Sequence, residues 1–286
     1  MTLNFPIPFA KMSGAGNDFI LIDHRTPFLT SVEAMQAFAR AVCEHKFSVG
    51  ADGLILIEKA TDADFRWQFI NADGSIAEMC GNGARCAARF AFAKGIAPAR
   101  MRFHTLAGII EAEVVDHAVK IRMTPPHNPR LHESLVVDGQ PRTVHSLNTG
   151  VPHAVLFMEE NAQAPVFEWG RIIRFHDHFA PAGTNVNFVE HLGGNRLSVR
   201  TYERGVEGET LACGTGAVAS AIIAGLLGKV EPPVAVTTSG REELVIHYRL
   251  AGEAAEAVFL EGPANFIYEG QLHPEALRRM EADSVR

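Results

Sequence analysis

One short motif occurs twice in the chain and constrains its fold more than any other feature. Residues 80–90 read CGNGARCAARF and residues 213–223 read CGTGAVASAII, so each copy is Cys-Gly-x-Gly-Ala followed by small, apolar residues typical of a buried helix. Two other features repeat in the same order: an asparagine (Asn17 in GNDF, Asn185 in TNVNF) and a polar segment before the cysteine (71–75, 202–205). The repetition predicts a duplicated chain that folds as two pseudo-symmetric domains.

The remaining pattern predicts many strands and few helices. Helices are expected at 32–43, 83–94 and 214–227. Short stretches rich in β-branched and aromatic residues predict strands at 19–23, 54–58, 65–70, 119–123, 155–158, 187–190, 197–202, 244–248 and 257–261. Their partial alternation is typical of antiparallel sheets. We therefore expect an α+β fold, not a doubly wound parallel sheet.

A proline-rich segment near the middle of the 286-residue chain predicts the domain boundary. Residues 124–129 read TPPHNP, and three prolines in six positions disfavour regular structure. We expect a first domain over 1–124 and a second over 125–264, with the tail 265–286 returning to the first. A length of 286 residues agrees with about two domains.

Composition and charge argue against several classes of function. Lys and Arg number 26 against 33 Asp and Glu, with a net charge of −7 and no basic run, so we expect no nucleic-acid partner. The longest apolar run, 217–227, is too short to cross a bilayer, and the first residues lack the pattern of a secretion signal. We expect a cytoplasmic protein without a membrane partner. Its four cysteines include no CxxC and are expected to be reduced. His176 and His178 alone do not indicate a metal site.

The repeated motif has a chemical meaning. A cysteine at a helix start lies beside unpaired backbone N–H groups, which are expected to lower its thiol pKa, and the glycines let the backbone approach an anion. Equivalent thiols at Cys80 and Cys213, facing one cleft between the domains, suit proton exchange at a stereocentre. One thiol removes the Cα proton and the other returns a proton to the opposite face. Cys43 and Cys86 lie within helical stretches and are predicted to be core residues.

The motifs resemble those of the diaminopimelate epimerase family over nearly the whole chain. They are KMSGAGNDF (11–19), GADGL (50–54), NADGSIAEMCGNGARC (71–86), NTGVPH (148–153), NVNF (185–188), YERGVEGETLACGTG (202–216) and GPANFIYEG (262–270). The resemblance implies two pseudo-symmetric domains, each a mostly antiparallel sheet or barrel around a central helix. It implies epimerisation of LL- to meso-diaminopimelate for lysine and peptidoglycan-precursor biosynthesis, without pyridoxal phosphate, metal or nucleotide cofactor.

The resemblance also assigns residues. Cys80 and Cys213 are implied as the catalytic bases, with His153 and Glu203 assisting their protonation states. The implied substrate-binding residues are Asn17, Asn71, Gly81, Asn82, Asn185, Glu203, Arg204, Gly214 and Thr215. An arginine such as Arg204 can bind a distal carboxylate with two parallel hydrogen bonds. Tyr268 matches a family position at a homodimer contact, so a homodimer is expected.

The sequence departs from the family pattern at two positions. Val151 stands where the family frequently has Asn in a Gly-Asn-Pro-His motif. Gly53 follows Asp52 where some members have a glutamine, so it offers no side-chain contact there. Both departures concern substrate binding more than the reaction.

Three alternative functions stay open at this point. A proline-racemase-like racemase or epimerase would act on another amino acid and would not need Arg204 as a carboxylate clamp. A thiol-dependent hydrolase or transferase would use one cysteine with His153, whereas duplication predicts that both cysteines matter. A non-catalytic binding protein would tolerate replacement of both thiols.

Overall fold

The chain divides into two compact units in the computed structural model, which describes residues 3–278. Unit 1 comprises residues 1–121 and 263–286, and unit 2 comprises residues 122–262. The boundaries expected from the sequence, 124/125 and 264/265, lie a few residues further along the chain. Each unit is described by itself.

Unit 1 is built on one mixed sheet. Its strands are β1 (Ile7–Gly14), β2 (Asn17–Asp23), β3 (Gly53–Glu58), β4 (Phe65–Asn71), β5 (Arg100–Thr105), β6 (Gly108–Val115), β7 (Ala118–Arg122) and β17 (Asn265–Leu272). They follow the order β17-β1-β2-β3-β4-β5-β6-β7, and the pairs β2–β3 and β4–β5 are parallel while the others are antiparallel. The C-terminal strand β17 therefore lies beside the N-terminal strand β1 at one edge of this order.

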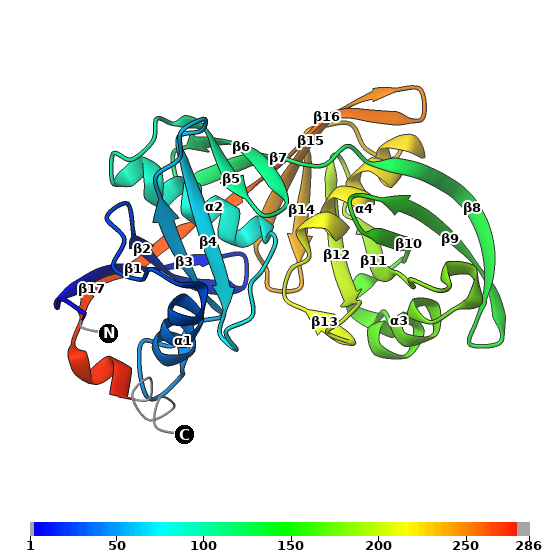
Figure 1. Ribbon diagram of the computed structural model, residues 1–286. Helices are drawn as coiled ribbons and strands as arrows, with labels where there is room; N and C mark the ends of the chain where they lie inside the picture. Colours follow the sequence, from blue (N-terminus) through cyan, green and yellow to red (C-terminus); the bar gives the residue numbers. More distant parts are fainter. Residues whose placement is uncertain (1–2, 279–286) are drawn as a thin grey trace. The chain divides into compact units, whose positions relative to one another are not determined.

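A central helix and an outer helix pack on opposite faces of this sheet. Helix α2 (Gly81–Ala93) contacts β1, β2, β3 and β6, so the sheet curves around it (Figure 1). Helix α1 (Val32–Cys43) packs on β3 and β4, beside the short helix η3 (Pro274–Leu277). Alternate side chains of a strand point to opposite faces, so Leu54 and Leu56 join the cluster that includes α1, while Ile55 lies against α2.

Unit 2 has the same plan. Its strands are β8 (His127–Val137), β9 (Gln140–Asn148), β10 (Pro152–Phe157), β11 (Asn185–His191), β12 (Arg196–Glu203), β13 (Gly208–Thr210), β14 (Val234–Thr238), β15 (Glu243–Ala251) and β16 (Ala254–Pro263). The order is β8-β9-β10-β11-β12-β14-β15-β16, with β13 paired to the end of β12 and with β10–β11 and β12–β14 parallel.

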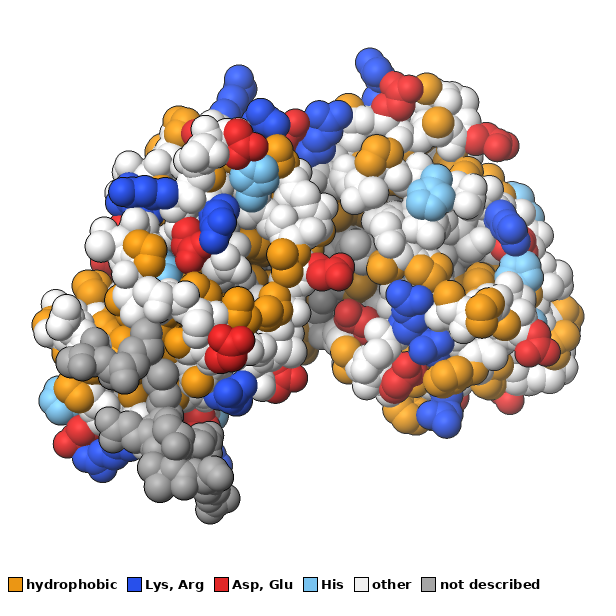
Figure 2. Space-filling model, viewed as in Figure 1, with side chains coloured by type: hydrophobic (Ala, Val, Ile, Leu, Met, Phe, Trp, Pro, Cys, Tyr) orange, Lys and Arg blue, Asp and Glu red, His pale blue; other side chains and the backbone are white. Residues whose placement is uncertain are grey.

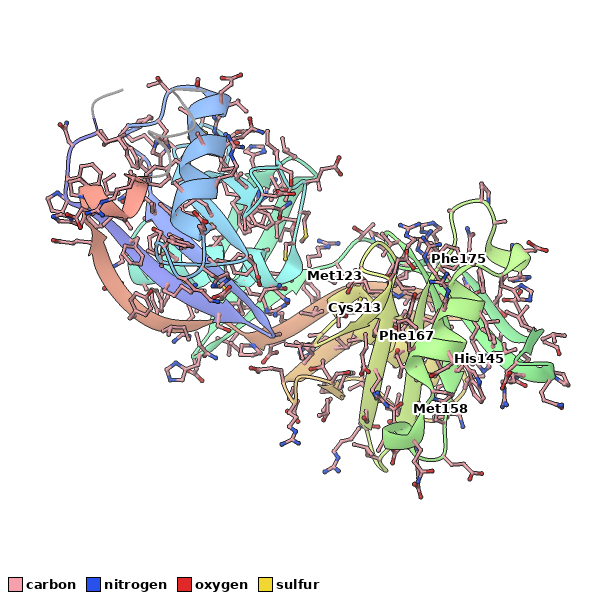
Figure 3. The ribbon with its side chains drawn as sticks, turned by 90° about the horizontal axis from the view of Figure 1, so that it is seen from below. Met123, His145, Met158, Phe167, Phe175 and Cys213 are labelled. Carbon is pink, nitrogen blue, oxygen red and sulfur yellow. The ribbon has the colours of Figure 1, made fainter. Side chains whose placement is uncertain are left out.

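The helices of unit 2 repeat the arrangement as well. Helix α4 (Gly214–Leu226), drawn in yellow in Figure 1, contacts six strands from β9 to β15. Helix α3 (Val166–Arg174) packs on β11 and β12, flanked by the short helices η1 (Asn161–Gln163) and η2 (Asp177–Phe179). In Figure 3, the labelled residues Phe167 and Phe175 mark the two ends of α3.

The two sheets match strand by strand. Read from β17 in one unit and from β8 in the other, the pairings are antiparallel, antiparallel, parallel, antiparallel, parallel, antiparallel and antiparallel. The central helix follows the same crossover in both. The predicted α+β fold of two pseudo-symmetric domains is therefore confirmed.

The strand registers correct one detail of the predicted repeat. Phe19 of β2 pairs with Gly53 of β3, and His153 of β10 pairs with Asn185 of β11. Phe19 and His153 are thus equivalent, which makes Val151, two residues before His153, the counterpart of Asn17. The pairing of Asn17 with Asn185 was wrong because these residues open different strands of the two sheets.

The predicted elements are confirmed, with small changes at their ends, but others were missed. The three predicted helices are α1, α2 and α4, and each predicted strand corresponds to one strand of the structure. The missed elements are β1, β5, β6, β8, β9, β13, β14, β17 and α3. The expected break at 124–129 is shorter than predicted, because β8 begins at His127 and includes Pro129. Irregular pairing with β9 accommodates this proline near the start of β8.

Two further properties concern the surface charges and the helices. On the face shown in Figure 2, basic and acidic side chains are interspersed on each unit. Within residues 3–278, every helix is too short or too polar to span a membrane.

We expect Gly170→Ala to destabilise unit 2. Gly170 of α3 lies against the buried Tyr202 of β12, and an added Cβ would lie 2.5 Å from the Tyr202 Cβ atom, which belongs to a packed strand. Overpacking of this kind costs about 1–3 kcal/mol, although alanine is the better helix former. Urea unfolding measures the effect, with Glu168→Ala, an exposed change on the same helix, as control. A Gly170→Ala protein as stable as the wild type would contradict this packing.

Candidate active site

The two motif cysteines occupy the same structural position in their units. Cys80 precedes α2 and Cys213 precedes α4, each with an extended backbone. The carbonyl of Cys80 accepts a hydrogen bond from the Ala84 N–H (2.8 Å), and that of Cys213 accepts one from the Ala217 N–H (2.9 Å). Both side chains are half-buried, and neither cysteine forms a disulfide. Each thiol therefore lies at the positive end of a buried helix.

The other two cysteines lie in the core, as predicted. Cys43 and Cys86 are buried free thiols, and burial raises the pKa of each to about 12. Such thiols are protonated and unreactive at neutral pH.

The surroundings of Cys213 raise its pKa. Removal from water and the negative charge of Glu203 together raise the pKa of the thiol to about 11. The Thr215 hydroxyl, 3.5 Å from Sγ, and the backbone N–H groups of Gly216 and Thr215 act in the opposite direction. The expectation that the helix start lowers the pKa was wrong for Cys213, because burial and the carboxylate outweigh the helix. In the substrate-free chain Cys213 is a thiol at neutral pH.

The second glycine of the motif lets each central helix lie directly on the sheet. A Cβ atom on Gly216 would be 2.2 Å from Oδ1 of Asn187 and 3.2 Å from Sγ of Cys213. A Cβ atom on the equivalent Gly83 would be 3.3 Å from Cδ1 of Ile55. At Gly216 a larger residue would require Asn187 or the start of the helix to shift, whereas at Gly83 a small movement of the Ile55 side chain would suffice.

In unit 1, two predicted binding residues join one hydrogen-bond chain. Nδ2 of Asn82, in the first turn of α2, donates to Oδ1 of Asn17 (2.8 Å), and Nδ2 of Asn17 donates to Asp52 (2.9 Å). The buried Arg85 donates to Oδ1 of Asn82 (2.7 Å). These contacts fix the orientation of both amides: Oδ1 of Asn82 faces Arg85, and Oδ1 of Asn17 faces Asn82. Asn71 is the last residue of β4. Its side chain donates to the Ser75 hydroxyl (2.9 Å), which lies outside this series of hydrogen bonds.

In unit 2, the predicted residues gather at the ends of three adjacent strands. Oδ1 of Asn185 accepts a hydrogen bond from the Arg204 N–H (2.8 Å), and Glu203 accepts one from the Thr210 hydroxyl (2.9 Å). The Arg204 guanidinium donates to the Ala182 carbonyl (3.1 Å). His153 is directly opposite Asn185 in the parallel pair β10–β11. Figure 3 labels Cys213, at the start of α4 in the same unit.

His153 is a buried, neutral histidine. Burial, reinforced by the positive charge of Arg204, lowers its pKa to about 3. Its Nδ1 atom lies 3.1 Å from Nδ2 of Asn187, whereas Nε2 is buried without a hydrogen-bond partner within residues 3–278. Because the folded-state pKa is below the unfolded value, this histidine reduces stability as the pH falls below about 6.5.

The structure therefore divides the predicted residues into two groups. Unit 1 holds Asn17, Asn71, Cys80, Gly81 and Asn82, and unit 2 holds His153, Asn185, Glu203, Arg204, Cys213, Gly214 and Thr215.

Four further residues make hydrogen bonds that support these groups, and the sequence did not identify them as site residues. They are Asp52, Arg85, Asn187 and Thr201. One signal was available for Asn187. It is two residues beyond Asn185, and side chains at this spacing share a strand face. Nothing in the local sequence separates Arg85 or Thr201 from ordinary helix and strand residues.

The residues considered for a metal have other roles. Nδ1 of His176 accepts a hydrogen bond from the His178 N–H (3.1 Å), and Nε2 of His178 lies 3.1 Å from a carboxylate oxygen of Glu133. Within the described part of the chain, no group of three or more His, Cys, Asp and Glu residues has the arrangement of a metal site.

Solved structures define the class of fold. A PhzF-family phenazine biosynthesis protein from Bacillus anthracis superposes with a TM-score of 0.67 at 14% identity, covering 94% of this chain and 100% of that one. A probable proline racemase from Agrobacterium radiobacter superposes with a TM-score of 0.64 at 16% identity, covering 95% of each chain. The chain thus has the duplicated α+β fold that these proteins share.

Sequence comparison identifies the family within this class. The profile described as diaminopimelate epimerase matches residues 9–128 and 145–267. A diaminopimelate epimerase of Aquifex aeolicus is 48% identical over 279 residues, covering 94% of this chain and 99% of the relative. One of Archaeoglobus fulgidus is 40% identical and covers 95% and 98% of the two chains. The chain belongs to the diaminopimelate epimerase family, which confirms the resemblance found in the motifs.

We expect Glu203→Gln to increase the reactivity of Cys213. The Glu203 carboxylate raises the pKa of this thiol, so its neutralisation increases the thiolate fraction. Alkylation of Cys213 by iodoacetamide at pH 8, followed by peptide mass spectrometry, is expected to become several-fold faster. Glu256→Gln, which removes a surface carboxylate paired with Arg249, is the control. An unchanged or slower rate in Glu203→Gln would show that this carboxylate does not control the thiol.

Proposed function

We propose that the chain interconverts LL- and meso-diaminopimelate by proton exchange at one α-carbon. The observation that carries the proposal is the equivalent placement of Cys80 and Cys213 at the starts of α2 and α4, in a chain of this family. One cysteine removes the α-proton as a thiolate, and the other delivers a proton to the opposite face as a thiol. Their roles exchange in the reverse direction.

The electrostatic properties of unit 2 suit the proton-delivering role. A thiol with a pKa of about 11 is protonated at neutral pH, so Cys213 holds a proton before the substrate binds. Glu203 acts on this thiol through its charge. After Cys213 has delivered its proton, the Thr215 hydroxyl and the helix N–H groups would stabilise the thiolate.

Each unit offers polar residues suited to the charged groups of the substrate. Arg204 is suited to a carboxylate, and the amides of Asn17, Asn71, Asn82 and Asn185 can donate to carboxylate and accept from ammonium groups. Gly81, Gly214 and Thr215 belong to the first turns of α2 and α4, whose N–H groups favour negative charge. This charge stabilisation would favour loss of the α-proton beside the carboxylate.

The setting of the reaction follows from its chemistry. None of the four cysteines forms a disulfide, which suits the reducing cytoplasm, where we place the reaction in lysine and peptidoglycan-precursor biosynthesis. The thiols and the helix N-termini supply acid, base and charge stabilisation, so the proposed mechanism uses no cofactor. We also propose that the two compact units are the two epimerase halves.

A related racemase is the second candidate. The proline racemase likeness covers most of the chain at a TM-score of 0.64. Arg204 favours the two-ended substrate, because a cyclic amino acid has no second carboxylate for this residue to bind.

We expect isotope incorporation to test the reaction directly. Reduced protein incubated with LL-diaminopimelate in deuterated water, without added cofactor, is expected to form meso product with solvent deuterium at one α-carbon. Cys80→Ala and Cys213→Ala are each expected to lower turnover by about 10²–10⁴-fold, the usual contribution of general acid–base catalysis. Cys43→Ala, which removes a core thiol, is the control and is expected to stay active.

Each outcome separates the candidates. Near-normal turnover in either site variant would exclude the two-base mechanism. Lack of conversion by folded, reduced wild-type protein would exclude diaminopimelate as substrate, and proline-type amino acids would then be assayed in the same way.

We further propose that the protein is a homodimer formed through β17. Tyr268 and Ile267 on this strand are 45% and 57% exposed, and the Tyr268 ring packs edge-on against Phe9 of β1 (5.8 Å between centroids). Tyr268→Glu is expected to shift the protein to a monomer in sedimentation velocity. Leu106→Glu, a charge placed on another exposed apolar residue of unit 1, is expected to leave the dimer intact. A Tyr268→Glu dimer would refute this interface.

A further inference from the structure

A buried polar group in unit 2 takes the place of an apolar group in unit 1. The strand registers make His153, Asn187 and Thr201 equivalent to Phe19, Ile55 and Phe69. In unit 1 these residues form ordinary core contacts, including an edge-on contact between Phe19 and Phe69 with 5.7 Å between ring centroids. The fold therefore does not require polar side chains at these positions. Buried polar groups are costly, so their presence in unit 2 indicates a role in function.

The hydrogen bonds of Asn187 determine the orientation of its amide. Its side chain is fully buried, and Nδ2 donates to the Ala154 carbonyl (3.0 Å). A carbonyl oxygen only accepts, so this contact requires the NH₂ group on that side. Oδ1 faces the other way and accepts from the Thr201 hydroxyl (3.0 Å). The second N–H of the same NH₂ group points at Nδ1 of His153, 3.1 Å away.

This orientation determines which nitrogen of His153 carries the proton. Nδ1 faces a donor and must present its lone pair, so in the neutral imidazole the proton is on Nε2. Nε2 is itself buried and has no partner within residues 3–278. The N–H is thus held ready for an acceptor that residues 3–278 do not provide.

We propose that Asn187 is a positioning residue that holds His153 as a neutral Nε2–H hydrogen-bond donor, so that His153 stabilises a negatively charged acceptor in the reaction and does not act as a base. This proposal deepens the proposed function and rests on it for the identity of the acceptor, a thiolate sulfur or a substrate carboxylate oxygen. It also changes the role expected for His153 from the sequence. A nitrogen that already carries a proton cannot take one from a thiol.

The charges around His153 agree with this role. Arg204, at the end of β12, places a positive charge near the imidazole, and together with burial it disfavours a second proton. On the side of α4, Gly216 lies against both Asn187 and the Cys213 sulfur, and Cys213 is a neutral thiol. His153 therefore stays neutral from pH 5 to 8.

Nitrogen NMR of substrate-free, histidine-labelled protein measures the tautomer directly. Protonated and unprotonated imidazole nitrogens resonate far apart, and comparison with His153→Gln assigns the signal of His153 among the 13 histidines. We expect a protonated Nε2 and an unprotonated Nδ1 from pH 6 to 8. An Nδ1–H tautomer or an imidazolium in the wild-type protein would overturn the proposal.

Two variants separate positioning from mere packing. Asn187→Asp keeps the shape but replaces the donor by an acceptor, so we expect the proton to move to Nδ1 or the imidazole to become charged near neutral pH. Thr201→Val removes only the hydroxyl that binds Oδ1. The Ala154 carbonyl still orients the amide, so the wild-type tautomer is expected. A wild-type tautomer in folded Asn187→Asp would show that Asn187 does not control it.

Activity supplies a second readout. In Asn187→Asp we expect at least a tenfold loss of kcat, with a new dependence on pH between 5 and 8 that the wild type lacks, because His153 then titrates there. A loss of activity with an unchanged pH profile would indicate a structural role and refute positioning. The spectra need no substrate, so failure of the epimerase assay would refute the proposed function without altering the result for His153.

Discussion

The close contact between each central helix and the sheet around it is the constraint on which the rest of the structure depends. Helices α2 and α4 are enclosed by strands, and their first turns approach the sheet without side chains at Gly83 and Gly216. This contact buries the helix body, places the cysteine at its start beside the strand ends, and leaves the first backbone N–H groups free of helical partners. The position of each thiol is thus a consequence of core packing, which makes it rigid.

Duplication has produced two units with the same pairing of strands and different electrostatic properties. In unit 1, the amides of Asn17 and Asn82 form a chain that ends on Asp52. In unit 2, Val151 stands at the position of Asn17 and has no amide, and Asn185 of the neighbouring strand accepts a hydrogen bond from the Arg204 N–H.

The same difference extends into the core. His153 lies where unit 1 has Phe19, and its buried nitrogen has no partner in the described chain, whereas the phenylalanine has no polar atom to satisfy. One copy of the fold thus has an apolar core under its central helix, and the other has a polar group there, at some cost in stability. Such a cost is typical of functional sites.

The sequence by itself determined the class of fold and the family, and it placed Cys80 and Cys213 at equivalent positions of a repeat. Strand patterns and prolines act locally, and motifs can be compared with a family position by position. It did not determine the strand order, and the exposed strand β8 and the paired β17 lack a strong local pattern. Only the tertiary structure decided the raised pKa of Cys213, since burial and the nearby Glu203 are set by packing. The tertiary structure also decided the environment of His153. The register of β10 and β11 places Asn187 beside it, although the two residues lie 34 positions apart in the sequence and no local pattern links them.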